Sequence, residues 1–325
     1  MSIEEQLKEE FKLNAKNVVC PPTIDLRVMN ACREQMLEKK GEQPMRRRGK
    51  LSKAIMLILL IAVVSGFAYA GRTLLFEETK GNMTMSAAKL EEFKLSKAQL
   101  EGIRQARNEV KAQLNPGDSA VVYLTDLEDV TSMPFFPVSQ PEVNEDLNTW
   151  RTVLMDHHFD VVPPDSLLGT YRFAGGMELS PFGVFWGSET DMAALQEDMK
   201  VESELSGKDM VWRITQAPSS LPMLSYTTTY RNSEQETLYL VMEAALDSKV
   251  KVQLVTPSTT KYEKMDLNGY SAHYFKNDSY IYTDNNFYQE ISWMTEREGR
   301  AIIYRIGTDS PSMTKEKLME AAQSL

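Results

Sequence analysis

An uncharged apolar stretch of 18 residues runs from Ala54 to Gly71 with the sequence AIMLILLIAVVSGFAYAG. As a helix with a rise of ~1.5 Å per residue it would be about 27 Å long, close to the ~30 Å thickness of a bilayer's hydrocarbon core. The stretch therefore predicts a single transmembrane helix over 51–72, in a single-pass membrane protein. A buried helix of a water-soluble domain is the alternative interpretation.

The residues that flank this stretch predict its orientation. Glu77 and Glu78 follow it, whereas basic residues cluster before it. Because basic loops stay in the cytoplasm, the N-terminus is expected there and the C-terminal domain is expected to be extracytoplasmic, with the helix acting as a signal-anchor in the cell membrane. The predicted topology determinants are Arg46, Arg47, Arg48, Lys50 and Lys53.

The end of the stretch, Ala68-Tyr69-Ala70, has the small-x-small pattern of a signal-peptide cleavage site. About 50 residues precede the stretch, whereas signal peptides carry a short basic region. We therefore expect an uncleaved anchor. Cleavage after Ala70 is the alternative.

Charge is divided unevenly along the chain. Residues 1–53 hold 12 basic and 8 acidic residues, and the remainder holds 24 basic and 38 acidic residues. An acidic body argues against nucleic acid as its partner, because phosphate binding needs clustered Lys and Arg. The two cysteines, Cys20 and Cys32, are too few for a structural zinc site. No metal and no cofactor are expected.

The first 50 residues are predicted to form a helical cytoplasmic head. Its second helix is expected to begin near Thr23 and to run to about Lys40, before Gly41 and Pro44. Apolar residues on one face of this helix could dock a cytosolic partner as a helix in a groove. They are Ile24, Val28, Ala31, Met36 and Leu37.

The segment after the apolar stretch is predicted to change from a linker to a helix. Residues 73–85 are expected to be a juxtamembrane linker, and 86–325 an extracytoplasmic α+β domain. Apolar residues recur at helical spacing from Leu90 to Leu114, which predicts a long helix over 86–114 that is capped by Ser86. A weak interruption near Ser96 leaves open that this is two helices.

Short runs rich in Val, Tyr, Thr and Trp follow, which is a strand pattern. One helix, 189–204, is expected among the strands. The expected strands are Ala120–Leu124, Tyr171–Ala174, Val184–Trp186, Met210–Ile214, Leu224–Tyr230, Leu238–Ala244 and Val250–Val255.

The C-terminal part predicts an antiparallel meander. Asn268-Gly269 separates 261–267 from 270–275, and this dipeptide is a strong signal for a tight hairpin. Tyr280–Tyr282, Tyr288–Met294 and Ala301–Ile306 are expected to form the next strands, and Thr314 to cap a closing helix, 315–325. The predicted fold class is thus α+β: a single transmembrane helix, then an outer domain with an antiparallel sheet, a long N-terminal helix and a C-terminal helix.

The sequence holds no recognisable catalytic pattern. A nucleophile elbow and a phosphate-binding loop are both missing, so no enzyme is expected. Adjacent His157 and His158 would point to opposite sides of a strand, which argues against a metal site. The alternation around His273 places it on the solvent face of its strand. The many aromatic residues of the final meander are expected to pack across strands, and a ligand groove is the alternative.

Two segments carry a resemblance to known proteins. VVCPPTIDLRVMNACREQMLEKK, followed by Arg46 to Arg48 and the apolar stretch, resembles the head of bitopic anti-sigma-type proteins of spore-forming Gram-positive bacteria. Many such heads carry a His-x3-Cys-x2-Cys zinc motif, which this chain lacks. The order N-G-Y-x-A-x-Y, I-S-W, Y-R-I-G and a final K-L-M-E-A-A-Q-S-L resembles an outer domain of unassigned function in sporulation-associated membrane proteins.

The resemblance implies an anti-sigma-like regulator or sensor whose extracytoplasmic domain binds an unknown ligand and whose head binds a sigma factor or another regulator. Two alternatives stay open. One is a passive structural or interaction module of the envelope. The other is a lipid- or peptide-binding domain that uses the concave face of the sheet.

Overall fold

The computed structural model describes residues 56–58, 72–90, 94–130, 134–182, 189–215, 223–246, 249–297 and 299–325. The chain divides into two compact units, Met1–Ser52 and Lys53–Leu325. Every described residue belongs to the second unit, so the fold below is the fold of that unit.

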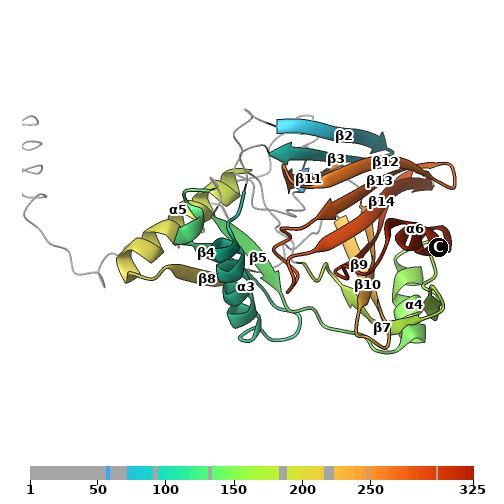
Figure 1. The fold of residues 1–325 in the computed structure, drawn as a ribbon, viewed down its shortest axis with the longest axis horizontal. Coiled ribbons are helices and arrows are strands. Elements are labelled where there is room, and N and C mark those ends of the chain that lie inside the picture. Colours follow the sequence, from blue (N-terminus) through green and yellow to red (C-terminus); the bar gives the residue numbers. More distant parts are fainter. Residues whose placement is uncertain are drawn as a thin grey trace, which may run out of the picture. The chain divides into compact units, whose positions relative to one another are not determined.

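An antiparallel sheet of eight strands is its largest element, in the order β12-β13-β14-β15-β10-β9-β7-β6 (Figure 1). The Asn268-Gly269 turn sets its first hairpin. Both residues have positive φ angles, 52° and 86°, as a tight hairpin turn requires. The strands are β6 (Ser166–Leu167), β7 (Tyr171–Glu178), β9 (Met223–Arg231), β10 (Thr237–Ala245), β12 (Lys261–Leu267), β13 (Tyr270–Asn277), β14 (Tyr288–Arg297) and β15 (Arg300–Thr308).

Two helices cover one face of this sheet: α4 (Leu147–Asp156) and α6 (Lys315–Gln323) (Figure 1). Asp146 caps α4, and Thr314 caps α6 by accepting a hydrogen bond from the backbone N–H of Lys317. Alternate residues of the strands pack beneath the helices in one hydrophobic core with Trp150 and Leu318. The predicted cap and closing helix are confirmed.

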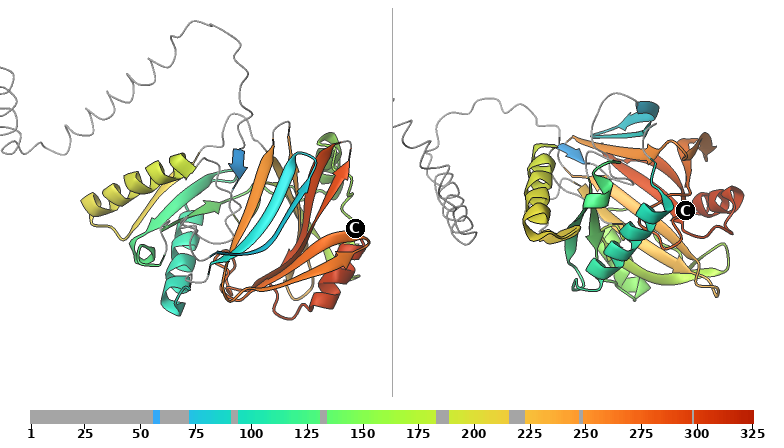
Figure 2. Two further views of the ribbon diagram at one scale, coloured as in Figure 1. Left: turned by 90° about the horizontal axis from the view of Figure 1, so that it is seen from above. Right: turned by 60° about the vertical axis from the view of Figure 1, so that its left-hand side comes forward.

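A second sheet, in the order β1-β11-β3-β2, packs against the opposite face. It consists of β1 (Met56–Ile58), β2 (Arg72–Lys80), β3 (Met83–Leu90) and β11 (Val250–Pro257). Its core residues, which include Met83 and Val252, contact Phe275 and Ile303 of the large sheet. Figure 2 shows the β2–β3 hairpin beside the strands of the large sheet.

A third sheet, β5-β4-β8, carries two further helices of the described ranges, α3 (Lys97–Lys111) and α5 (Glu189–Ser206) (Figure 1). The strands are β4 (Ser119–Leu124), β5 (Phe135–Ser139) and β8 (Met210–Thr215), and a 3-10 turn, η1 (Thr125–Leu127), follows β4. Ile103 and Val110 of α3 share a core with Val122 of β4. That core continues to Tyr280 and Tyr288, which joins this layer to the large sheet.

The predicted membrane-crossing helix is corrected by this structure. Met56–Ile58 form β1, which pairs in parallel with β11 so that Met56 lies opposite Val250. Across the described ranges, no helix is both long and apolar enough to cross a membrane. These findings contradict the single-pass, signal-anchor topology and the cell-membrane localisation, with its cytoplasmic N-terminus and extracytoplasmic domain. A short apolar run suits a buried strand as well as a helix, and periodicity alone does not separate the two.

The long N-terminal helix and the predicted linker are also wrong. Residues 73–85 lie in β2 and β3, and Ser86 lies inside β3, where it is buried. The helix begins only after Ser96. The Ser96 side chain accepts a hydrogen bond from the backbone N–H of Gln99, and the backbone N–H of Ser96 donates to the side-chain oxygen of Gln99. This capping box fixes the start of α3, and Leu90 is the last residue of β3. The unit therefore consists mostly of strands, whereas the predicted α+β fold included a long N-terminal helix.

Most of the predicted strands are confirmed, as is the helix at 189–204, which is α5. Tyr280–Tyr282 is a buried turn and no strand. Val184–Trp186 and Ala68–Ala70 lie outside the described residues.

Glu236, at the start of β10, is expected to make stability depend on acidity. Its carboxylate accepts hydrogen bonds from Ser310 and Ser312, and also from Asn232 and Tyr171. The bonds from Ser310 and Ser312 lower the pKa of Glu236 to about 2. A carboxyl whose pKa is depressed by folding stabilises the fold above its unfolded pKa, near 4.5, and this contribution is lost as pH falls toward 2.

Glu236→Gln should therefore lower the free energy of unfolding at pH 7 by on the order of 1 kcal/mol, since solvent screens a partly exposed group. The variant should also flatten the pH dependence of stability between about pH 5 and 2. Urea unfolding at several pH values measures both effects. Glu234→Gln, a change two residues away at an exposed turn, is the control and should retain the wild-type pH dependence.

Candidate functional site

Three charged side chains meet inside the unit, on neighbouring strands of the large sheet. Glu243 lies on β10, Arg305 on β15 and Glu290 on β14. Arg305 pairs with Val241 of β10 on one side and with Ser292 of β14 on the other. Glu243 lies two residues after Val241, and Glu290 lies two residues before Ser292. Because side chains alternate along a strand, all three point to the face away from α4 and α6.

The three groups are almost fully buried. Glu243 has 0% of its surface exposed, and Glu290 and Arg305 each have 7%. Arg305 Nη2 lies 2.9 Å from Glu243 Oε2, and Arg305 Nη1 lies 3.8 Å from Glu290 Oε1. Within the described part of the chain, neither carboxylate oxygen of Glu243 accepts a hydrogen bond of good geometry. Such a group is costly to bury, which marks the position as unusual.

Burial also changes the acidity of these groups. Loss of solvent raises the pKa of Glu243, although Arg305 opposes this effect, and loss of solvent likewise raises the pKa of Glu290. Burial by itself lowers the pKa of Arg305, but the two carboxylates outweigh it and hold the pKa above its usual value. With both carboxyls ionised, the three groups sum to one negative charge, so the site favours a proton or a cation.

The three charges line a cavity of about 50 Å³, and we call it the acidic cavity. Phe182, Phe275, Tyr280 and Tyr288 form its aromatic walls. The rings of Tyr280 and Tyr288 stack with centroids 4.6 Å apart, and Phe182 meets Tyr288 edge-on at 5.0 Å. Its polar lining comes from Ser180, Thr256, Thr260 and Asn277.

The space suits a small guest. A water molecule needs ~10–15 Å³ by this measure, so the acidic cavity has room for roughly three to five water-sized groups. A lipid chain is far larger. In the residues described, the opposite face of the sheet is filled by side chains under α4 and α6, which counts against the lipid-carrier alternative.

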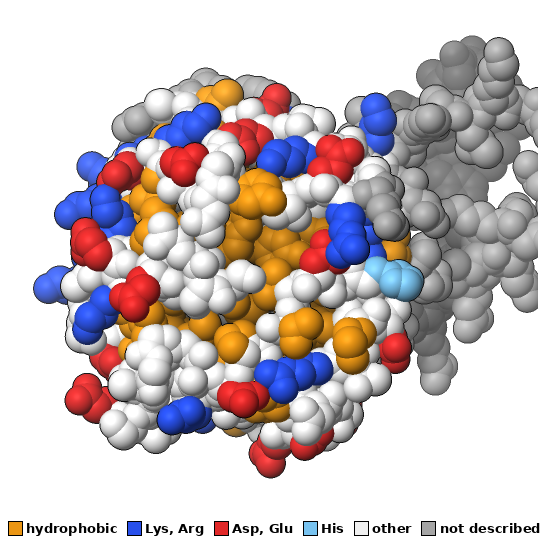
Figure 3. Space-filling view, turned by 90° about the vertical axis from the view of Figure 1, so that its right-hand side faces the viewer, with side chains coloured by type: hydrophobic (Ala, Val, Ile, Leu, Met, Phe, Trp, Pro, Cys, Tyr) orange, Lys and Arg blue, Asp and Glu red, His pale blue; other side chains and the backbone are white. Residues whose placement is uncertain are grey.

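A second hollow lies at the end of the large sheet that faces the viewer in Figure 3. Its hydrophobic floor is rimmed by charged side chains, which include the ion pair between Arg297 and Asp160. Trp293 and Tyr304 stack beneath it at 5.5 Å, but they are only 5% and 2% exposed. Its charged rim is in contact with solvent, since the side chain of Arg297 is 63% exposed, whereas the three charges of the acidic cavity are buried. We therefore rank the acidic cavity first.

The structure also places His273, and the predicted solvent-facing position is wrong. His273 is fully buried. Phe76 of β2 stacks on its ring at 3.5 Å, Glu78 lies 3.4 Å from Nε2, and Tyr262 lies 3.1 Å from Nδ1. Strand β2 covers this face, and the alternation within β13 alone could not show that cover.

The other predicted site residues fall outside the described part of the chain. These are the topology determinants and the partner-binding face from Ile24 to Leu37. The sigma factor as a partner therefore stays a prediction.

No known protein family, curated protein or solved structure matches this chain. Its function is therefore argued from the site.

Proposed function

We propose that the unit Lys53–Leu325 is a sensor-type binding domain whose ligand carries a protonated amine. The observation that carries this proposal is Glu243, a fully buried carboxylate whose oxygens accept no well-aligned hydrogen bond from the described residues. An ammonium group would supply the missing donors and would balance the excess negative charge.

The aromatic walls support the same ligand class. Cations are attracted to the faces of aromatic rings, and this attraction strengthens when water is excluded. Tyr280 and Tyr288 stand beside two carboxylates in a small cavity, which suits a compact cation better than a neutral or anionic group. The competing occupant is a proton, held by one of the two carboxyls.

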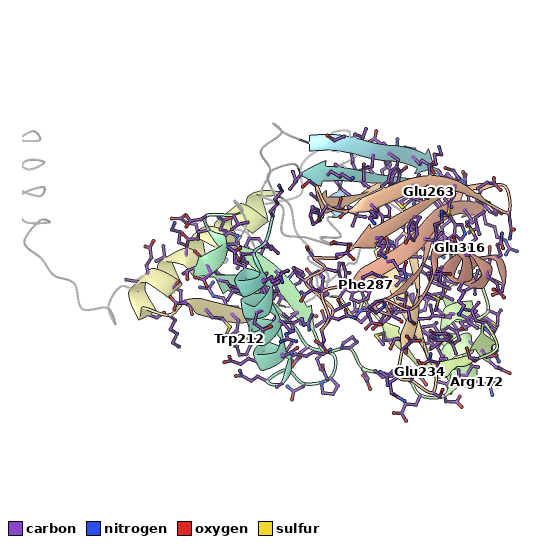
Figure 4. All side chains as sticks on the ribbon, viewed as in Figure 1. Arg172, Trp212, Glu234, Glu263, Phe287 and Glu316 are labelled. Carbon is purple, nitrogen blue, oxygen red and sulfur yellow. The ribbon has the colours of Figure 1, made fainter. Side chains whose placement is uncertain are left out.

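Binding of small amines separates these two occupants. Calorimetric titration of the full-length chain with methylammonium and ethylammonium should show binding, whereas ethanol and acetamide should not bind. Glu243→Gln keeps the shape of the side chain but removes its charge, so it should weaken amine binding at least tenfold. Glu234→Gln, at the exposed turn between β9 and β10 (Figure 4), is the matched control and should bind as the wild type does.

Acid should weaken amine binding as well. The pKa of both carboxyls is raised by burial, so they take up protons at a higher pH than exposed glutamates do. Affinity should therefore fall as pH decreases through this range. If no amine binds at millimolar concentration, or if Glu243→Gln binds amines as the wild type does, the proposal is wrong.

A further inference from the structure

A third space, a pocket of about 400 Å³, is also lined by Phe182. We call it the basic pocket, because Arg107, Lys111 and Arg231 line it. Phe182 belongs to the walls of both pockets. Its ring contacts Tyr239 in the basic pocket, at 5.0 Å, and Tyr280 in the acidic cavity, at 5.5 Å. The two spaces, which differ in character, therefore adjoin at this ring.

The basic pocket carries a net positive charge. Its three cations face two carboxylates, Asp284 and Asp309. Arg107 forms an ion pair with Asp284 and donates to the backbone oxygen of Ile281 at 2.9 Å, so these two charges offset each other. Burial raises the pKa of Asp309, which lowers its negative charge at a given pH.

Lys111 and Arg231 are the cations left to meet a ligand. Both are exposed, and neither forms an ion pair with another side chain of the described ranges. Their long side chains can move toward an anion without breaking a contact that holds the fold together.

We propose that the ligand is a zwitterion of the amino-acid class, with its ammonium group in the acidic cavity and its carboxylate in the basic pocket. This inference rests on the proposed function, and it adds the second charged group of the ligand. Opposite net charges in the two spaces that adjoin at Phe182 match a molecule with opposite charges at its two ends. A simple amine would leave the basic pocket unused, and a simple acid would leave Glu243 and Glu290 without a cation.

A ligand series on the full-length chain tests this inference. The series compares n-butylammonium, butyrate, 4-aminobutanoate, 6-aminohexanoate and glycine by calorimetric titration. We expect at least one amino acid to bind tenfold more tightly than n-butylammonium, and butyrate not to bind. The spacing of the two charges in the tightest ligand then distinguishes an α-amino acid from an ω-amino acid.

Variants in the basic pocket test the position of the carboxylate. Lys111→Gln and Arg231→Gln should each lower the affinity for amino acids several-fold and leave the affinity for n-butylammonium unchanged. Lys208→Gln, another exposed lysine outside both pockets, is the control and should change neither.

The possible outcomes separate the two proposals. If n-butylammonium binds but no amino acid binds more tightly, the zwitterion inference is overturned and the amine-binding function stands. If an amino acid binds more tightly than n-butylammonium, but Lys111→Gln and Arg231→Gln bind it as tightly as the wild type does, the carboxylate lies elsewhere and the inference also fails. If neither amines nor amino acids bind, the proposed function itself fails.

Discussion

Replacing Arg305 by methionine is expected to lower the free energy of unfolding by about 3–5 kcal/mol. The guanidinium is 7% exposed and lies between the carboxylates of Glu243 and Glu290. Its removal leaves two buried acidic groups without a counter-charge, away from bulk solvent. Urea unfolding at pH 7 measures the loss.

Two further measurements make this expectation specific. Arg213→Met removes an exposed arginine that pairs with Glu202, and it should cost less than about 1 kcal/mol. The loss in Arg305→Met should also shrink as pH falls, because the raised pKa of each carboxyl lets the folded protein take up protons before the unfolded chain does. Equal losses for the two arginine variants would contradict the role assigned to Arg305.

Replacing Trp150 by alanine is expected to cost about 3–5 kcal/mol, through the cavity left by a large buried ring. Trp150 is 1% exposed, and its indole N–H donates to Thr228 Oγ1 at 2.8 Å. The ring lies directly on Gly176 of β7, where an added Cβ would come within 2.0 Å of it. Trp212→Ala, which removes a half-buried ring from β8 (Figure 4), is the control and should cost clearly less.

The contact between Trp150 and Gly176 gives this expectation a second test. Gly176→Ala alone should cost about 1–3 kcal/mol, because the methyl group displaces the ring. In the Trp150→Ala background, the same change should cost little, since the space is already open. A double-mutant cycle measures this coupling, and strictly additive losses would show that ring and glycine do not constrain each other.

The C-terminal meander could be predicted from the sequence because its signals are local. Asn268-Gly269 defines the turn, and the alternation on either side of it defines the strands. The start of the helix predicted over 86–114 was wrong for an equally local reason. Leu90, Phe93 and Leu95 happen to match helical spacing, whereas the capping pair Ser96 and Gln99, also visible in the sequence, marks the true start.

The site could not be predicted in the same way. Glu243, Glu290 and Arg305 are scattered over more than sixty residues, and they meet only because β15 lies between β10 and β14. Strand order and register depend on long-range packing. One signal was nonetheless present: Glu243 and Arg305 are single charges inside apolar strands, LYLVMEAA and AIIYRIG. A buried strand retains such a charge at a free-energy cost, which makes it worth noting in a sequence.

The position of β3 between β2 and β11 also has a consequence for folding. Residues 83–90 pair with 250–257, so more than 150 residues must be synthesised before this sheet can close. Pairings of such large sequence separation slow folding, because chain entropy is lost before the contacts are gained. The wall of strands that buries His273 is therefore expected to assemble late, after the hairpins of the meander have formed from their own neighbours. During translation, the β2–β3 hairpin would remain without β11 until the last quarter of the chain emerges.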